Sequence, residues 1–414
     1  MPEIRPFEGI RYAQVDDLKD LVCPPYDVIS PTEQDALYEK HPNNAIRFEL
    51  PRPERESDEP KRARYEAANE RLKTWLDEKI LKTDDVATFY VYRQDFVAPK
   101  GERRQVTGII GALRLEEFGE SSGVLPHERT MPGPIEDRLT LLRACPVNFS
   151  PIYGIYRGGG QLMPFLDALE HRPTAGRLAD EHNNLHRLWT ITAPAEIEML
   201  ALALGRGPFV IADGHHRYET ALAFAREQPG PGPHESVMAF CVDADAGDLE
   251  VLPYNRAFMT EQTPDEIESA LTTSFSCESF DPGKGQDALE RSKSDHPLLF
   301  VLGGSEILVE LTDKQVREVV GDRAPAWRDL DVVALHEVVF ARVFGGPPER
   351  LVFSHDGAEI MRLVGEERWT GGVLLRPMRA AEVIEVAKSG ERMPQKASYF
   401  WPKAITGLVF RSLK

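Results

Sequence analysis

The central architecture of this chain is decided by residues 207–217, which read Gly-Pro-Phe-Val-Ile-Ala-Asp-Gly-His-His-Arg. The apolar run over 209–212 predicts a strand, and apolar residues at helical spacing over 218–225 predict a helix directly after it. At such a turn the N–H groups of the first helical turn and the helix dipole point outward, so an anion is stabilised there. A glycine lets a phosphate approach the main chain, and an arginine can hold its oxygens through two hydrogen bonds. The predicted phosphate ligands are Gly214, His215, His216 and Arg217.

Two other interpretations of this turn stay open. In the first, Asp213 only caps the helix and the two histidines are solvated. In the second, Asp213 and either His215 or His216 bind a metal ion. Adjacent histidines on a turn generally cannot both reach one ion, and no H-E-x-x-H helix accompanies them.

Composition excludes several classes of protein. The chain has 414 residues, enough for two or three packed units, and a formal net charge of −18. Binding along nucleic-acid backbones needs clustered Lys and Arg, so no nucleic-acid partner is expected. No stretch approaches the roughly 20 apolar residues of a membrane span, and the first residues do not resemble a leader, so a cytoplasmic location without a membrane partner is expected. The four cysteines form no C-x-x-C pair, which indicates buried thiols rather than a zinc site or a disulfide framework.

Alternating strand and helix patterns predict an α+β or mixed α/β fold. An amphipathic helix is expected over 62–80, and a β-hairpin is expected from strands at 89–92 and 106–115. Strands and helices then alternate from residue 152 to residue 212. The predicted division is a motif-bearing α/β core over 1–258, an inserted α/β subdomain over 259–345, and a C-terminal β-α-β-α unit over 346–414 whose tail packs back on the core.

The segment Ile211–Arg217 resembles the nucleotide-phosphate turn of the ParB/sulfiredoxin superfamily, which includes partition-protein CTPases, sulfiredoxin and free-serine kinases. In those relatives the glycine amide, the next polar pair and the arginine hold the phosphates, usually with Mg²⁺. The resemblance implies a ParB/sulfiredoxin-like core with added N-terminal and C-terminal α/β elements. It also implies ATP, ADP or CTP as the nucleotide.

Four further blocks lie around the turn in sequence. They are Pro-Pro-Tyr-Asp-Val-Ile-Ser at 24–30, His-Glu-Arg-Thr at 127–130, Asn-Phe-Ser-Pro-Ile at 148–152 and Met-Pro-Gln-Lys at 393–396. Together with the turn they resemble the uncharacterised bacterial and archaeal family called domain of unknown function ten-fifteen, from Pro6 to Gly407. Residues 253–256 depart from the family, which usually has a proline followed closely by His-Arg there. Arg256 is retained and is a candidate anion ligand.

The blocks supply the remaining candidate residues. Asp27 is a pre-positioned carboxylate for Mg²⁺, although 24–30 is also consistent with a plain turn. In the loop at 127–130 we expect Glu128 to be the general base and His127 or Arg129 to contact phosphate, with a salt-bridged structural loop as the alternative. Aromatic residues 399–401 are expected to fix Lys396 and Lys403 near phosphate rather than to stack single-stranded nucleic acid.

The leading hypothesis is a Mg²⁺-dependent phosphotransferase or nucleotide hydrolase acting on a small metabolite. The resemblance makes free L-serine the first candidate acceptor. The predicted catalytic residues are Glu128, His127 and Asp213. A nucleotide-sensing binding module of the ParB type is the second hypothesis, and it does not need Glu128. A metal-dependent hydrolase that uses His127, His215 and Asp213 is the third.

Overall fold

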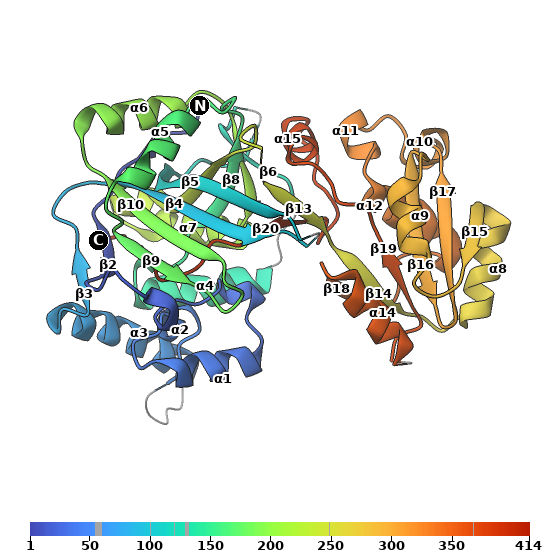
Figure 1. The fold of residues 1–414 in the computed structure, drawn as a ribbon, viewed down its shortest axis with the longest axis horizontal. Helices are drawn as coiled ribbons and strands as arrows, with labels where there is room; N and C mark the ends of the chain where they lie inside the picture. Colours follow the sequence, from blue (N-terminus) through green and yellow to red (C-terminus); the bar gives the residue numbers. More distant parts are fainter. Residues whose placement is uncertain (54–59, 100, 120, 129–131, 248, 367) are drawn as a thin grey trace. The chain divides into compact units, whose positions relative to one another are not determined.

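The computed structural model describes residues 1–53, 60–99, 101–119, 121–128, 132–247, 249–366 and 368–414. The chain forms a mixed α/β fold with several sheets, as the sequence predicts (Figure 1). Two compact units are present. Unit 1 comprises Met1–Pro126, the described part of 130–249 and Pro402–Lys414, and unit 2 comprises Glu250–Trp401 together with His127 and Glu128. No helix of the described residues is long and apolar enough to cross a membrane.

The main sheet of unit 1 has nine strands within the described residues. Their order is β6 (Val124–Pro126), β11 (Phe209–Asp213), β8 (Ile152–Tyr156), β12 (Ser236–Asp243), β5 (Arg103–Arg114), β4 (Phe89–Val97), β10 (Leu185–Ile191) and β9 (Gly176–Ala179), with β1 (Ile4–Arg5) paired to β5. The hairpin of β4 and β5 is the predicted one. Pairing is antiparallel except between β11 and β6 and between β12 and β8, so the sheet is mixed.

Both faces of this sheet are buried. On β4, Phe89 and Val91 belong to one apolar cluster, while the alternate residues Tyr90 and Tyr92 point to the opposite face. Three helices pack on the Phe89 face, namely α5 (Met163–Ala168), α6 (Pro194–Leu204) and α7 (His215–Glu227). Unit 1 also contains α1 (Pro31–Lys40), α2 (Ile46–Glu49), α3 (Pro60–Asp77) and α4 (Pro132–Ala144), and a second sheet ordered β3 (Leu81–Thr83), β2 (Gly9–Tyr12), β21 (Phe410–Ser412) and β7 (Val147–Asn148). The predicted helix at 62–80 corresponds to α3.

Unit 2 is built on an antiparallel sheet ordered β15 (Ser276–Phe280), β17 (Ser305–Leu311), β16 (His296–Leu302), β19 (Gly371–Leu374), β14 (Asn255–Met259) and β18 (Arg350–Ser354). A separate pair joins β13 (Glu250–Pro253) to β20 (Ser398–Trp401). The helices are α8 (Pro264–Ser274), α9 (Gly285–Arg291), α10 (Asp313–Val320), α11 (Pro325–Arg328), α12 (Asp331–Val333), α13 (Phe340–Phe344), α14 (Gly357–Gly365) and α15 (Ala380–Lys388), and a π-helical turn spans Ala334–Val339.

The two compact units do not follow the three predicted segments. Strands from both sides of the predicted boundary at 345/346 pair in one sheet, because β14 lies between β18 and β19, and β16 also pairs with β19. These pairings satisfy main-chain groups that separate subdomains would leave without partners. Residues 402–414 return to unit 1, where β21 pairs with β2 and β7.

Candidate functional site

The predicted strand-to-helix turn is present in unit 1. The strand β11 ends at Asp213, and Gly214 precedes α7 with φ of 88°. That left-handed backbone favours glycine, and a Cβ at this position would lie 3.1 Å from the guanidinium carbon of Arg217. Gly214 occupies the N-cap position, and the carboxylate of Asp213 accepts from Arg217 and Lys403 rather than from a main-chain amide of α7, so Asp213 does not cap the helix. The capping interpretation of Asp213 is therefore wrong.

Asp213 is instead the counter-ion of two cations. Its Oδ2 accepts a hydrogen bond of 2.8 Å from Arg217, and its Oδ1 forms an ion pair with Nζ of Lys403. The three side chains are only 14%, 12% and 10% exposed for Asp213, Arg217 and Lys403. Burial alone would raise the pKa of Asp213, but Lys403 and Arg217 outweigh burial and hold that pKa below its usual range. Asp213 is therefore ionised at neutral pH.

Arg217 is held in place by two hydrogen bonds that leave part of its guanidinium without a described partner. One terminal nitrogen donates to the carbonyl of Pro151 and the other to Asp213. Its Nε donates to no acceptor among the residues that the structure describes. Burial would lower the pKa of Arg217, but Asp213 and Asp27 raise it, so the side chain stays a cation. A fixed cation beside a helix N-terminus is suited to binding an anion.

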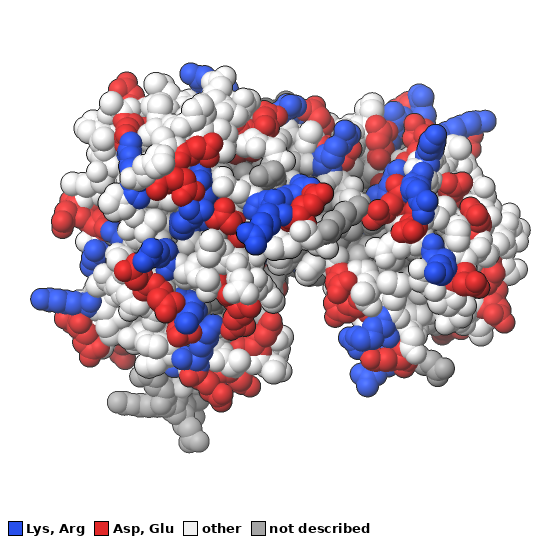
Figure 2. Space-filling model, in the orientation of Figure 1, with Lys and Arg blue, Asp and Glu red and all other residues white. Residues whose placement is uncertain are grey.

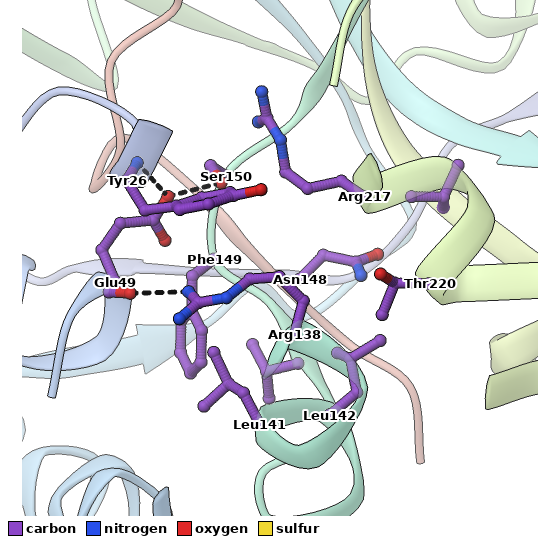
Figure 3. Close-up of a pocket in the computed structure, with 12 residues that line it drawn as sticks. Tyr26, Glu49, Arg138, Leu141, Leu142, Asn148, Phe149, Ser150, Arg217 and Thr220 are labelled. Atoms are coloured by element: carbon purple, nitrogen blue, oxygen red, sulfur yellow. Dashed lines mark hydrogen bonds between the residues drawn. The ribbon is translucent and has the colours of Figure 1, made fainter. Parts of the chain in front are cut away.

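A cavity of about 50 Å³, lined by both polar and apolar side chains, lies beside Arg217 within unit 1 (Figure 3). Helix α7 supplies Arg217 to one side of it, and the carboxylate of Glu49 lies on the other. The lining residues are Tyr26, Glu49, Arg138, Leu141, Leu142, Val147, Asn148, Phe149, Ser150, Arg217, Thr220 and Val237. Residues from three of the blocks that the sequence singles out, at 24–30, at 148–152 and at 211–217, therefore share one cavity.

Glu49 is a site residue that the sequence analysis missed. It ends α2 and is only 3% exposed. Its Oε1 accepts hydrogen bonds from the Ser150 hydroxyl at 2.7 Å and from the Tyr26 amide at 3.2 Å. Residues 46–50 read Ile-Arg-Phe-Glu-Leu, in which apolar and charged residues alternate, so the local pattern does not indicate that this carboxylate is buried.

Arg138 also lines the cavity. It donates to the main-chain carbonyl of Glu49 at 2.8 Å and to Asp137 at 2.7 Å, and it lies 4.5 Å from the centre of the Tyr26 ring. Asp137 is thus an ion-pair partner of Arg138. Burial is the main reason that the pKa of Tyr26 is raised to about 12, so its phenol remains protonated at neutral pH.

The remaining predicted residues of unit 1 lie close to this cavity or to the turn. Asp27 is exposed in the short helical turn Tyr26–Val28 and contributes to the raised pKa of Arg217. His215 is buried at the start of α7, and His216 is partly exposed. Lys403 is paired with Asp213 rather than presented alone. The ligand contacts of these residues stay predictions.

The remaining candidates belong to unit 2, except Arg129, which lies outside the described residues. His127 is 1% exposed, and its Nε2 lies 3.0 Å from the hydroxyl of Ser398. Glu128 accepts a hydrogen bond of 3.2 Å from the main-chain amide of Lys396. Lys396 is exposed with φ of 55°, and its Nζ lies 5.2 Å from the centre of the Tyr254 ring. The functional roles of these residues stay predictions.

The structure gives Arg256 a different role from the predicted anion contact. The side chain is fully buried, and its three nitrogens donate to His336, to the carbonyl of Tyr254 and to the carbonyl of Lys396. Burial lowers the pKa of Arg256 to about 9, which still leaves a cation at neutral pH. Arg256 therefore holds main-chain segments together, and each of its three nitrogens already has a partner inside the protein.

The alternative metal set of His127, His215 and Asp213 is not found. Across the described ranges, no group of three or more His, Cys, Asp or Glu side chains is arranged to hold a metal ion.

Charge is mixed on the molecular surface, where Lys and Arg are interspersed with Asp and Glu on the face drawn in Figure 2.

Residues 4–333 match a family model described as "Protein of unknown function (DUF1015)", so the chain belongs to that family. No curated protein matches the chain. A free serine kinase in complex with AMP is 13% identical, with a TM-score of 0.38 over 70% of this chain and 88% of that one. SbnI with a C-terminal truncation, from Staphylococcus aureus, is 10% identical, with a TM-score of 0.39 over 72% and 85%. A conserved hypothetical protein from Pyrococcus furiosus is 12% identical, with a TM-score of 0.35 over 67% and 87%.

Proposed function

We propose that this member of the DUF1015 family is a nucleotide-using phosphotransferase that acts on a small metabolite, with free L-serine as the first candidate acceptor. The observation that carries the proposal is the turn at Gly214. There, a glycine-initiated helix N-terminus and the fixed cation Arg217 lie next to a cavity of unit 1 that Glu49 and Arg138 also line. We further propose that the core of unit 1 is ParB/sulfiredoxin-like and that the protein is cytoplasmic.

The chemistry needed for phosphoryl transfer is mainly positioning and neutralisation of charge. The main-chain amides at the start of α7 and the guanidinium of Arg217 provide donors for phosphate oxygens. Asp213 holds Arg217 in this position, which lowers the conformational freedom that binding would otherwise remove. Glu128 is the proposed base for the acceptor hydroxyl.

Asp27 fits the role of a Mg²⁺ ligand. Its exposed carboxylate has neither a hydrogen bond nor an ion pair with any other described residue, and it is close enough to Arg217 to raise the pKa of that side chain. Mg²⁺ is commonly held by one or two carboxylates together with substrate phosphates, so a larger set of protein ligands is not required. When bound, the ion supplies neutralisation of the phosphate charge.

The proposal is tested by thermal unfolding with ATP, ADP and CTP, each with and without Mg²⁺. A ligand at 100 times its Kd stabilises a protein by about 2.7 kcal/mol, which gives a clear shift. Arg217→Ala should remove the shift. Arg226→Ala is a matched control on the same helix, because Arg226 forms only an exposed ion pair with Glu117.

An unchanged shift in the Arg217→Ala protein would remove Arg217 from the site, and the absence of any shift in the wild type would overturn the nucleotide proposal. Nucleotide-dependent stabilisation without turnover across a panel of hydroxyl-bearing amino acids would instead support a nucleotide-sensing module. Detection of a phosphorylated amino acid would support the phosphotransferase.

A further inference from the structure

Three residues on the wall of the unit 1 cavity each keep one polar atom without a hydrogen-bonding partner in the described part of the chain. These atoms are Oε2 of Glu49, the phenol oxygen of Tyr26 and Nε of Arg217. Figure 3 shows the three side chains around the same space. Within the described residues none of the three is a sealed, unsatisfied group, so water or a ligand that enters the cavity can reach them.

Some neighbouring polar groups on the same wall have partners within the protein. The side-chain oxygen of Asn148 accepts a hydrogen bond of 3.0 Å from the amide of Met238. The hydroxyl of Thr220 donates to the carbonyl of His216 at 2.6 Å. The open atoms of Glu49, Tyr26 and Arg217 come from three distant parts of the sequence, and the side-chain amide nitrogen of Asn148 is a further open donor among the described residues of this wall.

Glu49 is the most unusual of the three. Its carboxylate is buried, yet no Lys, Arg or His of the described ranges forms an ion pair with it, and Arg138 donates to its main-chain carbonyl instead. The oxygen Oε1 is fixed by Ser150 and by the Tyr26 amide, so the orientation of the carboxylate is set. A fixed carboxylate in which one oxygen has no partner within the protein can accept a hydrogen bond from a ligand.

The size of the cavity limits its occupant. A buried water needs roughly 10–15 Å³ on this measure, so about 50 Å³ corresponds to about four waters. That space suits the polar head group of a small molecule. The open atoms require both a donor, for Glu49, and an acceptor, for the Tyr26 hydroxyl and Nε of Arg217.

We propose that this cavity is the subsite for the acceptor substrate and that it binds a small carboxylate or similar anion that also carries a hydroxyl or ammonium group. Glu49 accepts the hydrogen bond from the hydroxyl or ammonium group, the Tyr26 hydroxyl donates to the anionic oxygen, and the positive charge of Arg217 nearby stabilises that anion. This inference rests on the proposed phosphotransferase, since it names the class of molecule that the same site receives. It assigns Glu49 and Tyr26 as substrate-binding residues.

The test measures binding of four probes to the full chain by calorimetry. L-serine carries a hydroxyl and an ammonium group, L-alanine only the ammonium, glycolate only the hydroxyl, and acetate neither. We expect L-serine to bind and acetate not to bind. Whether L-alanine or glycolate retains binding shows whether the ammonium or the hydroxyl group donates to Glu49. Loss of a hydrogen bond to a charged group predicts that Glu49→Gln weakens L-serine binding about tenfold or more.

Two other variants keep the test decisive. Tyr26→Phe removes only a hydroxyl that has no partner in the described structure, so it should fold normally and still weaken L-serine binding several-fold. Glu78→Gln changes an exposed glutamate of unit 1 and should bind like the wild type. Circular dichroism of each variant checks that a loss of binding is not a loss of fold.

The inference is overturned if none of the probes binds the wild type, or if acetate binds as well as L-serine. It is also overturned if both Glu49→Gln and Tyr26→Phe bind L-serine like the wild type. Nucleotide titrations on the same samples separate the two proposals. Glu49-dependent binding of L-serine without any nucleotide binding would retain the subsite and reject the phosphotransferase, and the reverse result would reject only the subsite.

Discussion

Asp213→Asn tests the charge arrangement at the turn. Asparagine keeps the size of the side chain but removes the negative charge that Arg217 and Lys403 share. Removing one partner of a buried ion pair typically costs about 3–5 kcal/mol, because the remaining charge is left buried. Asparagine retains a hydrogen-bond acceptor, so we expect the lower end, about 3 kcal/mol. With about 2–4 °C per kcal/mol for a unit of this size, the Tm of unit 1 should fall by about 6–12 °C.

The same substitution should change the response to anions. In the variant, Arg217 and Lys403 lack their counter-ion, so an added phosphate should bind them more tightly than in the wild type. Differential scanning fluorimetry with increasing inorganic phosphate, at constant ionic strength set by chloride, measures this response. The phosphate-induced rise in Tm should be larger in Asp213→Asn than in the wild type or in Asp85→Asn, an exposed control in unit 1.

The pH dependence gives an independent check. The pKa of Asp213 is lowered in the folded state, so the ionised carboxylate stabilises the folded protein at any pH above the ordinary carboxyl pKa of about 4. This stabilisation is lost progressively as the pH falls below about 4. The gap in Tm between the wild type and Asp213→Asn should therefore narrow at acid pH. If the variant unfolds like both controls and phosphate stabilises all three proteins equally, Asp213 is not the counter-ion that this reasoning requires.

Three further predictions concern other elements. Burial and Arg256 lower the pKa of His336 from 6.5 to about 3 in the folded state. As the pH falls, this histidine is therefore protonated in the unfolded state first, and the free energy of unfolding should decrease by about 2 kcal/mol from pH 6.5 to pH 5. His336→Gln should remove most of this slope in thermal unfolding at several pH values. Gly214→Ala should cost about 1–3 kcal/mol in denaturant unfolding because of its left-handed backbone, whereas Gly207→Ala, which has open space around it, should be nearly neutral. In Glu128→Gln the side-chain oxygen can still accept the hydrogen bond from the main-chain amide of Lys396. The variant should therefore bind nucleotide but lose turnover, because it lacks a proton acceptor. Full activity would mean that another residue is the base.

Local sequence patterns predicted the elements around the turn well. Strand β8 begins at residue 152, where the predicted alternation of strands and helices begins, and β11 and α7 form the predicted strand, turn and helix. These predictions depend on the spacing of apolar residues along a few turns or pleats, which is written in consecutive residues. Strand β15 and helix α9 were not predicted, because the short segment at 276–280 is only partly buried and lacks a clear apolar pattern.

The site depends on contacts between distant residues. Lys403 is 190 residues from Asp213, and Ser150 is 101 residues from Glu49. A sequence pattern identifies the chemistry of each side chain but not which opposite charge it will meet. The pairing of Lys403 with Asp213, the burial of Arg256 and the position of Glu49 therefore became visible only in three dimensions.

The return of residues 402–414 to unit 1 has a consequence during protein synthesis. Residues 250–401 are made after most of unit 1 and before β21 and Lys403. At about 5–20 residues per second, a ribosome needs on the order of ten seconds or more to make that intervening stretch. During this interval β2 and β7 lack the strand that joins them, and Asp213 and Arg217 lack Lys403. Newly made unit 1 therefore exposes unpaired strand edges to chaperones and neighbouring chains until unit 2 has been translated.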